Sequence, residues 1–529
     1  MKKQLCVWMA ILMLALTLLP CAIAADEGTE YAINKSTVDA NSTCLSYDTS
    51  WQTTKYVGLR KNRTFIVPVT VAKDGVYQVE VSAAALTGRT YSFGVLAGTD
   101  LDTVVADTVY TVGATYTSSS GSRNANYAYT TVTDSMVLYA GNYYLKFKLN
   151  AISNNDLLTV NNIRLTQVEP PMDMSINNAT YVADASAPAD TYSGDSAYLT
   201  AKYIGLREND YVTLPLPFGL AAGEYYVSLS AASLQPHKFT VRTADTLENL
   251  TAAQATSPIF GAGTSRTSAV ANELIGKITV AETDKYIRFD LISIGNQDLM
   301  TVSEYKLYKT LPTKEIAETL NFAPDTAMLT DSASRLNRAS AVIGAGKSVT
   351  FSVTAENTKT YQLGLAGKTA AETQEIAVTV NGETVETAPL AVSNGVCSGW
   401  LSAISLQAGE NVITFTNSAD SSLTVSRISI DSGWSLYASD FTALTEATDA
   451  IGDVYISMPE NLTNVKTFAA FYCGDELVAF ENINYASAVS ENYSDITAVY
   501  DAVKFFLWEE GINRPMDTHK TVTVSEVTE

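Results

Sequence analysis

The amino-acid sequence predicts an all-β protein built from several β-sandwich domains. Apolar and polar residues alternate in short runs, as at Phe65, Val67, Val69 and Val71, and such alternation is typical of half-buried strands. Helical periodicity is nearly absent, since residues 268–278 offer at most one short helix. A strand–turn–strand pattern also recurs along the chain. Together these observations predict a row of related β domains.

The recurring pattern is clearest in residues 141–165 and 283–307. Each copy reads as an apolar strand, a polar Asn/Asp turn and a second apolar strand, which we interpret as a hairpin that closes one domain. The shared residues occur in the same order and spacing: Tyr144, Phe147, Leu149, Ile152, Asn154, Asp156, Leu157, Thr159, Val160 and Leu165 correspond to Tyr286, Phe289, Leu291, Ile294, Asn296, Asp298, Leu299, Thr301, Val302 and Leu307. A looser copy runs from Gly409 to Ile430.

The length and composition of the chain agree with several domains. A chain of 529 residues exceeds the usual size of one domain, and 46% hydrophobic residues are enough for several cores. We predict a signal peptide (1–24), two jelly-roll-like β-sandwich repeats (25–169 and 172–311), a third jelly-roll-like module (313–432) and a smaller C-terminal Ig/fibronectin-like β-sandwich (433–529).

The first 24 residues have the features of an export signal. Lys2 and Lys3 precede the apolar residues 7–19, and Ala22-Ile23-Ala24 fits a cleavage site. An uncleaved anchor and lipid attachment at Cys21 are alternatives that this segment leaves open. We expect a secreted, extracellular protein without a membrane span in the mature chain, and association with a cell surface stays open.

The charge and the metal-binding residue types exclude several classes of partner. A net charge of −22 argues against nucleic acid and against anionic membranes. Three cysteines follow the signal, Cys44, Cys397 and Cys473, which is too few for a disulfide scaffold. With only His237 and His519, the usual zinc ligands cannot be assembled. We therefore expect no cofactor and no metal site, and calcium has no support in the sequence.

No motif for catalysis is evident. The chain has no Gly-x-Ser-x-Gly, no phosphate loop and no recognisable Ser–His–Asp set. A glycosidase carboxylate pair is usually built on a larger barrel or sandwich than these domains offer. We therefore expect no enzymatic activity.

An octet is repeated near the start of the first two domains. Residues 55–62 and 202–209 agree at six of their eight positions. A shared ligand site and a shared structural role both explain this, and the structural role is favoured because duplicated domains share folding constraints first. In that case Arg60 and Arg207 tie a loop to a neighbouring strand.

The third module contains Val380-Asn381-Gly382, Ser398-Gly399-Trp400 and the run Gly409-Glu410-Asn411-Val412-Ile413. With these residues it resembles the galactose-binding-like carbohydrate-binding modules of families six and thirty-five, and the first two domains look like diverged relatives. The resemblance implies that Trp400 stacks on a sugar and that Asn417 hydrogen-bonds it. The acidic calcium ligands of that family are not evident near the start of the module.

The C-terminal module contains Val503-Lys504-Phe505-Phe506-Leu507-Trp508, followed by Pro515. It resembles a β module found in cell-surface proteins of Gram-positive anaerobes, a resemblance that implies no particular chemistry. Trp508 stands among large apolar residues, and we expect it to lie in the core.

Sugar recognition needs flat aromatic faces together with a few polar groups. Trp400 lies in a Ser/Gly-rich stretch, where exposure and burial in the core are both open, and Asn417 can equally be a turn residue. Tyr127 and Tyr129, in the polar stretch 115–130, are further candidate platforms. The leading hypothesis is a secreted, non-catalytic protein that binds polysaccharide or glycan through loop aromatics. The alternative is a structural or adhesive bacterial surface protein without a sugar site, which self-associates or contacts other surface proteins through strand edges.

Overall fold

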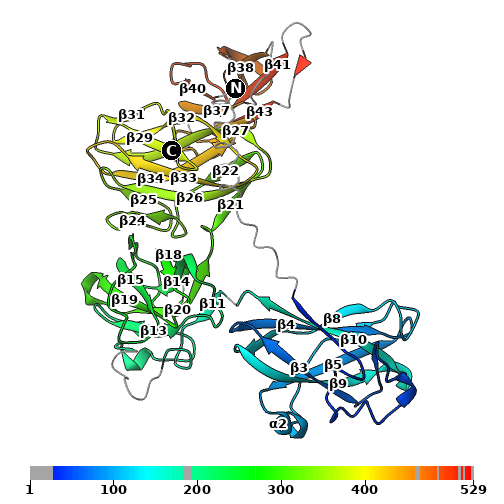
Figure 1. Ribbon diagram of the computed structural model, residues 1–529. Helices are drawn as coiled ribbons and strands as arrows, with labels where there is room; N and C mark the ends of the chain where they lie inside the picture. Colours follow the sequence, from blue (N-terminus) through cyan, green and yellow to red (C-terminus); the bar gives the residue numbers. More distant parts are fainter. Residues whose placement is uncertain are drawn as a thin grey trace, which may run out of the picture. The chain divides into compact units, whose positions relative to one another are not determined.

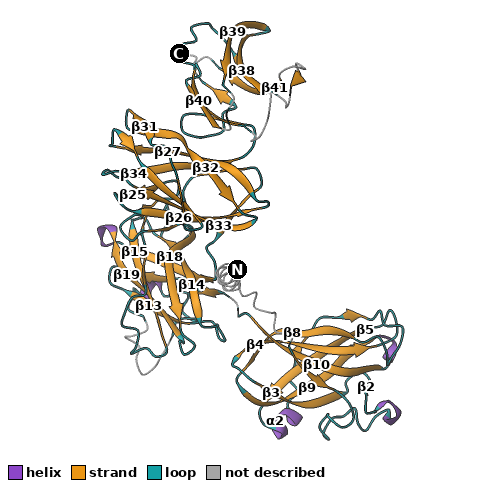
Figure 2. Ribbon diagram, turned by 45° about the horizontal axis from the view of Figure 1, so that its top comes forward, coloured by secondary structure: helices purple, strands orange, loops and turns teal. Residues whose placement is uncertain are grey.

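A computed structural model gives the fold (Figures 1 and 2). It describes residues 28–170, 172–182, 192–268, 270–448, 450–458, 465–484, 486, 488–509, 514–515 and 519–525. The prediction of an all-β protein is confirmed, because antiparallel sheets account for most of the regular structure described. Contacts divide the chain into two compact units: residues up to Pro171 together with Pro217–Leu220, and Met172–Leu216 together with Ala221–Glu529.

The first unit is a sandwich of two sheets. Its elements are β1 (Thr29–Ala32), β2 (Val57–Leu59), β3 (Thr64–Val71), β4 (Gly75–Ala84), β5 (Thr90–Gly98), α2 (Leu101–Ala106), β6 (Thr111–Val112), β7 (Tyr116–Thr117), β8 (Ala128–Leu138), β9 (Gly141–Ile152) and β10 (Leu158–Val168). One sheet has the order β1-β10-β4-β8, with β2 beside β10, and the other has the order β3-β9-β5-β6, with β7 beside β5. Alternate side chains of both sheets form one core, where Phe65 stacks on Phe147 with ring centroids 4.8 Å apart.

The repeated strand–turn–strand pattern is not a hairpin, which corrects our interpretation. Strand β9 belongs to one sheet and β10 to the other, so the turn carries the chain across the sandwich. Asn154 in this turn has φ 59°, and its counterpart Asn296 has φ 56°. The carboxylates of Asp156 and Asp298 each accept a hydrogen bond from the next backbone N–H at 2.8 Å. The shared residues therefore specify a crossover of the same geometry in both copies.

The second unit begins with the second repeat, which has the same layout. Its strands are β11 (Asp173–Ser175), β12 (Ile204–Leu206), β13 (Tyr211–Pro215), β14 (Gly223–Ala232), β15 (His237–Ala244), β16 (Ala255–Thr256), β17 (Ile259–Phe260), β18 (Val270–Val280), β19 (Tyr286–Ile294) and β20 (Met300–Tyr308). The order β11-β20-β14-β18, with β12 beside β20, matches the first sheet of the first unit.

Strand β18 replaces the short helix that we considered for residues 268–278. It pairs with β14, and a register shift at Ile275 inserts an extra residue into the ladder. This bulge buries Leu274, Ile275 and Ile278 together. Their spacing imitates a helical stripe, although the backbone is extended.

The repeated octets have a structural role. Strands β2 and β12 each pair with the last strand of their repeat, and the following Asn62 and Asn209 both have a positive φ, 67° and 69°. Arg60 pairs with Asp48 and also donates to the backbone carbonyl of Asn155 at 3.0 Å. Arg207 pairs with Asp195 at 3.1 Å. The two arginines thus tie the preceding loop in place, as the sequence suggested.

The third module also has two facing sheets. Its strands are β21 (Thr313–Ile316), β22 (Thr319–Phe322), β23 (Leu329–Thr330), β24 (Arg335–Leu336), β25 (Ala341–Ile343), β26 (Ser348–Ala355), β27 (Lys359–Thr369), β28 (Thr373–Gln374), β29 (Ile376–Val380), β30 (Glu383–Val385), β31 (Leu390–Ser393), β32 (Val396–Leu406), β33 (Gly409–Asn417) and β34 (Leu423–Asp431). The predicted Asn381-Gly382 turn is confirmed, since Val380 pairs with Glu383 and both turn residues have positive φ, 53° and 84°. Again β33 and β34 enter different sheets.

The C-terminal module contains β35 (Ser435–Tyr437), β36 (Glu446–Ala447), β37 (Asp453–Ser457), β38 (Val465–Cys473), β39 (Glu476–Ile483), β40 (Ala488–Asn492), β41 (Ala502–Glu509), β42 (Arg514–Pro515) and β43 (Lys520–Val524). One sheet is β35-β37-β40 and the other is β36-β43-β41-β38-β39, with β42 beside β41. Val503, Phe505 and Leu507 point into the core between them. The neighbouring Trp508 lies on the opposite face and is only partly buried, so its predicted core position is wrong.

Candidate functional site

Trp400 lies in strand β32 and contacts the C-terminal module. Its indole Nε1 donates a hydrogen bond to the backbone carbonyl of Val489 in β40 at 3.2 Å. Its ring packs edge-to-face against Phe441, with centroids 5.1 Å apart, and against Tyr437 at 6.0 Å. A ring held in this contact is not a loop platform of the kind that the resemblance implied.

Phe441 is the centre of this aromatic cluster. It is fully buried, and Tyr455 stacks on it with ring centroids 4.6 Å apart. Gly364 in β27 makes room for the ring, because a Cβ at this position would overlap it. Tyr455 also hydrogen-bonds through its hydroxyl to the carbonyl of Ser398 at 2.9 Å. The Ser398-Gly399-Trp400 stretch is therefore part of an interface between two modules.

Asn417 lies inside the third module, with no exposed surface. Its Nδ2 donates to the carbonyls of Ile343 at 3.0 Å and Ser421 at 2.7 Å. Its Oδ1 accepts from Gln374 Nε2 at 2.8 Å and from the N–H of Ala419 at 3.1 Å. All the polar atoms of this side chain are therefore used within the fold, which corrects its assignment as a ligand contact. Asn417 positions the loop that follows β33.

Tyr127 and Tyr129 are also engaged within the first unit. The hydroxyl of Tyr127 is 2.8 Å from Thr159 Oγ1. Tyr129 lies in strand β8 rather than in a loop, donates to Glu30 at 2.6 Å, and has the Arg164 guanidinium 4.2 Å from its ring centroid. Burial and the Glu30 carboxylate raise the pKa of Tyr129 to about 12. Both tyrosines belong to the first compact unit, whereas Trp400 and Asn417 belong to the second.

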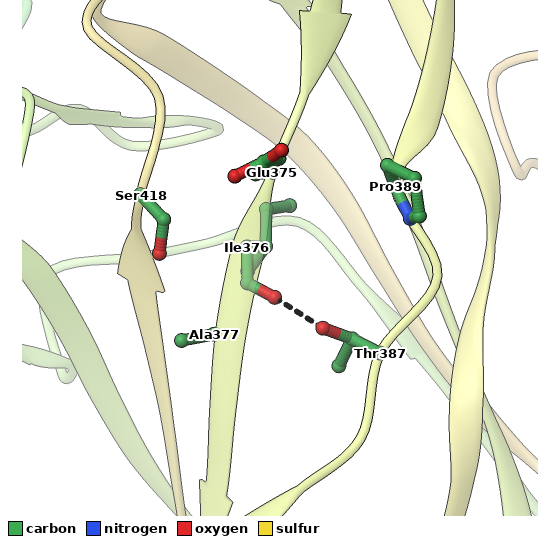
Figure 3. Close-up of a pocket in the computed structure, with 6 residues that line it drawn as sticks. All are labelled: Glu375, Ile376, Ala377, Thr387, Pro389 and Ser418. Atoms are coloured by element: carbon green, nitrogen blue, oxygen red, sulfur yellow. Dashed lines mark hydrogen bonds between the residues drawn. The ribbon is translucent and has the colours of Figure 1, made fainter.

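A small hollow of about 230 Å³ opens beside Asn417, on the surface of the third module (Figure 3). Its lining comes from three separate segments, namely the start of β29, the connection between β30 and β31, and the residue that follows β33. The lining residues are Glu375, Ile376, Ala377, Thr387, Pro389 and Ser418. No sequence motif predicted this hollow, although the candidate residue Asn417 directly precedes Ser418.

Two hydrogen bonds fix the shape of the hollow. The N–H of Ser418 donates to the carbonyl of Glu375 at 3.0 Å, so the loop after β33 is joined to the start of β29. The Thr387 hydroxyl donates to the carbonyl of Ile376 at 2.6 Å, as Figure 3 shows. Glu375 and Ser418 are exposed, and Pro389 adds an apolar surface. The hollow therefore combines an acidic acceptor, a hydroxyl and an apolar patch, which is the mixture that a polyhydroxylated ligand requires.

The described residues contain no group of three or more His, Cys, Asp or Glu side chains placed to hold a metal ion. In the same part of the chain, no helix is long and apolar enough to cross a membrane. Residues 1–27, which include the predicted signal peptide, lie outside the described residues.

Comparison with known proteins places the chain in no family. No family model and no curated protein match it. Among solved structures, it is similar to a Podospora anserina GH26-CBM35 β-(1,4)-mannanase (15% identity, 22% of this chain and 27% of that chain, TM-score 0.18). It is also similar to a Paenibacillus xanthan lyase (14%, 71% and 34%, 0.21) and to the adhesin domain of Epf from Streptococcus pyogenes (11%, 39% and 81%, 0.13).

The chain spans only about a quarter of the mannanase and a third of the lyase. Likenesses at these identities and TM-scores establish no shared function.

Proposed function

We propose that this chain is a secreted, non-catalytic protein whose third module binds carbohydrate in the hollow lined by Glu375, Thr387, Pro389 and Ser418. The observation that supports this proposal is the lining of the hollow. A carboxylate, a hydroxyl and the apolar ring of Pro389 line a volume of about 230 Å³. Carboxylates and hydroxyls hydrogen-bond sugar hydroxyls, and an apolar patch covers the C–H face of a sugar ring. The proposed site differs from the loop-aromatic site of the sequence hypothesis.

Binding in such an open hollow is shallow and requires no catalytic group. Glu375 is the carboxylate that lines it, whereas acid–base hydrolysis of a glycosidic bond uses a pair of carboxyl groups. We therefore assign recognition, rather than cleavage, to the hollow. Incubation of the full chain with the bound glycan, followed by a reducing-sugar assay, tests this part, and release of reducing ends contradicts it.

The direct test is a glycan array probed with the full chain, followed by titration of each bound glycan against variants. Glu375→Ala removes the carboxylate from the hollow, and we expect at least a tenfold loss of affinity for a charge-assisted contact. Glu383→Ala is the matched control, because Glu383 is an exposed glutamate of the same module outside the hollow. Equal binding by wild type and the Glu375 variant rejects the proposed site.

The alternative, a structural or adhesive protein, is favoured by one specific observation. Strand β17 of the second repeat pairs in parallel with β24 of the third module, so one sheet continues across both. Phe260, from β17, is fully buried in the core of the third module. Modules joined in this way act as a continuous support. If the chain binds no glycan on the array, that result favours this function.

A further inference from the structure

The outer face of the larger C-terminal sheet carries a row of stacked aromatic rings. Phe506 in β41, Phe468 in β38 and Phe480 in β39 lie on three neighbouring strands, and we call them the aromatic row. The Phe468 ring centroid is 4.9 Å from each of the other two, with interplanar angles of 23° and 38°. The ring faces are therefore turned toward one another across the strands.

The aromatic row stops at the edge of the sheet. Within the described residues, β39 pairs only with β38, so the backbone groups on its other side have no strand partner. Phe480 is 46% exposed, and Leu477 in the same strand is 52% exposed. A long unpaired edge with exposed apolar side chains readily pairs with a strand from another molecule. The row and the edge together form one surface that no strand of the described part of the chain covers.

We propose that β39 pairs with β39 of a second copy of this chain, antiparallel and about a two-fold axis at Phe480. An axis perpendicular to the sheet keeps the outer face of both copies on the same side. It places each Phe480 opposite the other, while Ala479 meets Glu481 of the second copy. No like charges stand directly opposite each other in this register.

The register explains why a second copy fits better than an unrelated strand. Directly opposed residues on one face of an antiparallel pair are about 4.5–5.5 Å apart. Phe468 and Phe506 are directly opposed in this way, and their ring centroids are 4.9 Å apart. The uncovered side of Phe480 therefore meets an identical ring at the spacing of the row. Both the backbone pairing and the ring stacking then continue through the axis, which gives a closed dimer.

The charge of the chain sets the expected salt dependence. Each copy carries a net charge of −22, so two copies repel each other at low ionic strength, and salt screens this repulsion. Association of two copies is therefore expected to strengthen as salt is raised. An anionic partner held by Lys466 and Lys504, which share the outer face with the aromatic row, would show the opposite dependence.

The test is the molar mass of the full chain by light scattering, from low micromolar concentration to about 100 µM and at low and high salt. We expect the mass to rise toward twice that of the monomer, more strongly at high salt. Phe480→Lys places a charge at the axis and should hold the chain monomeric. Val499→Lys adds the same charge at a 72% exposed position of the same module outside β39, and it should behave as wild type.

Two results overturn the proposal: a monomer at every concentration, or equal association of wild type and the Phe480 variant. A monomer that binds an anionic polymer through this face also overturns it. The proposal does not depend on the sugar hollow, because Glu375→Ala should leave the dimer unchanged.

A cross-linking experiment covers the case in which Phe480→Lys unfolds the module. In a Cys473→Ser background, Phe480→Cys places two thiols at the axis. Oxidised glutathione then converts them to an intermolecular disulfide and is itself reduced to two glutathione thiols. We expect a covalent dimer at Phe480→Cys and little at the control Val499→Cys, whereas equal cross-linking contradicts the register.

Discussion

Trp400 and Val489 join two modules through a hydrogen bond from the indole Nε1 to a backbone carbonyl 3.2 Å away. These residues lie 89 positions apart in the sequence, and the ring that belongs to the third module is partly covered by the C-terminal one. Trp400, which the family resemblance assigned to sugar stacking, thus helps to hold the two modules together. This relationship leads to the first prediction.

Phe441→Ala should destabilise the contact between the two modules, because Phe441 is fully buried and packs against Trp400, Tyr437 and Tyr455. Loss of a buried phenylalanine typically costs about 3–5 kcal/mol. Urea unfolding of the full chain followed by tryptophan fluorescence measures the change. Val499→Ala is the control, since a substitution at an exposed position is usually worth less than about 0.5 kcal/mol. Similar midpoints for both variants would contradict the role of the cluster.

The three cysteines that follow the predicted signal peptide should differ sharply in reactivity. Cys44 and Cys397 are fully buried, and burial raises the pKa of Cys44 to about 12 and that of Cys397 to about 11. The thiolate is the reactive form, so both should resist alkylation in the folded protein. Cys473 is exposed and should react. Timed iodoacetamide labelling with peptide mass spectrometry checks this, and early labelling of Cys44 would show that its surroundings open.

The strands were predictable from the sequence because burial follows the two-residue period of the backbone. The Asn381-Gly382 turn was predictable because positive φ at both positions favours this dipeptide. The crossover at Asn154 was mistaken for a hairpin, because local sequence does not reveal which sheet each strand joins. The bulge at Ile275 disguised a strand as a helix.

Site residues were harder to predict than strands. The surroundings of Trp400 come from a module far along the chain, and the hollow beside Asn417 is assembled from three segments. Such proximity is a property of the tertiary structure, and no local pattern encodes it.

Stability of the second repeat should decline as pH rises, because of His237. Its Nδ1 lies 3.0 Å from the Gln235 carbonyl and its Nε2 lies 2.8 Å from Glu273 Oε2, so a protonated ring donates at both nitrogens. Burial opposes the charge, but the Glu273 carboxylate and the hydrogen bonds outweigh burial and raise the pKa of His237. A raised pKa contributes stability that is full below the ordinary value of about 6.5 and is lost as pH rises through the folded-state value.

Urea midpoints between about pH 5.5 and 9 test this expectation. His237→Gln keeps a polar side chain without a charge in this range, so its midpoint should fall less over the same interval. Parallel pH profiles for the two proteins would assign the effect to other groups.

Asp156→Asn should destabilise its repeat more than Asp298→Asn destabilises the next one. Asp156 is bound by Arg89 at 2.9 Å and by Arg123 at 2.6 Å, whereas Asp298 pairs with Arg266 at 2.7 Å. Asparagine retains an oxygen for the backbone N–H but loses the ion pairs. We expect a cost of about 1–3 kcal/mol at Asp156, where the carboxylate is nearly buried, and less than about 1 kcal/mol at Asp298, whose arginine is more exposed.

The pH dependence of stability distinguishes the effect of the Asp156 charge from the effect of its side-chain shape. Burial raises the pKa of this carboxyl, but hydrogen bonds from Arg89, the Leu157 N–H and Arg123 outweigh it, so the net pKa is lowered. A lowered pKa contributes stability that is full above the ordinary value of about 3.9 and is lost as pH falls through the folded-state value. Wild type should therefore lose its advantage over Asp156→Asn as acid is added, measured by circular dichroism during urea unfolding. A difference that stays constant down to the acid limit would mean that the arginines contact this turn without stabilising it.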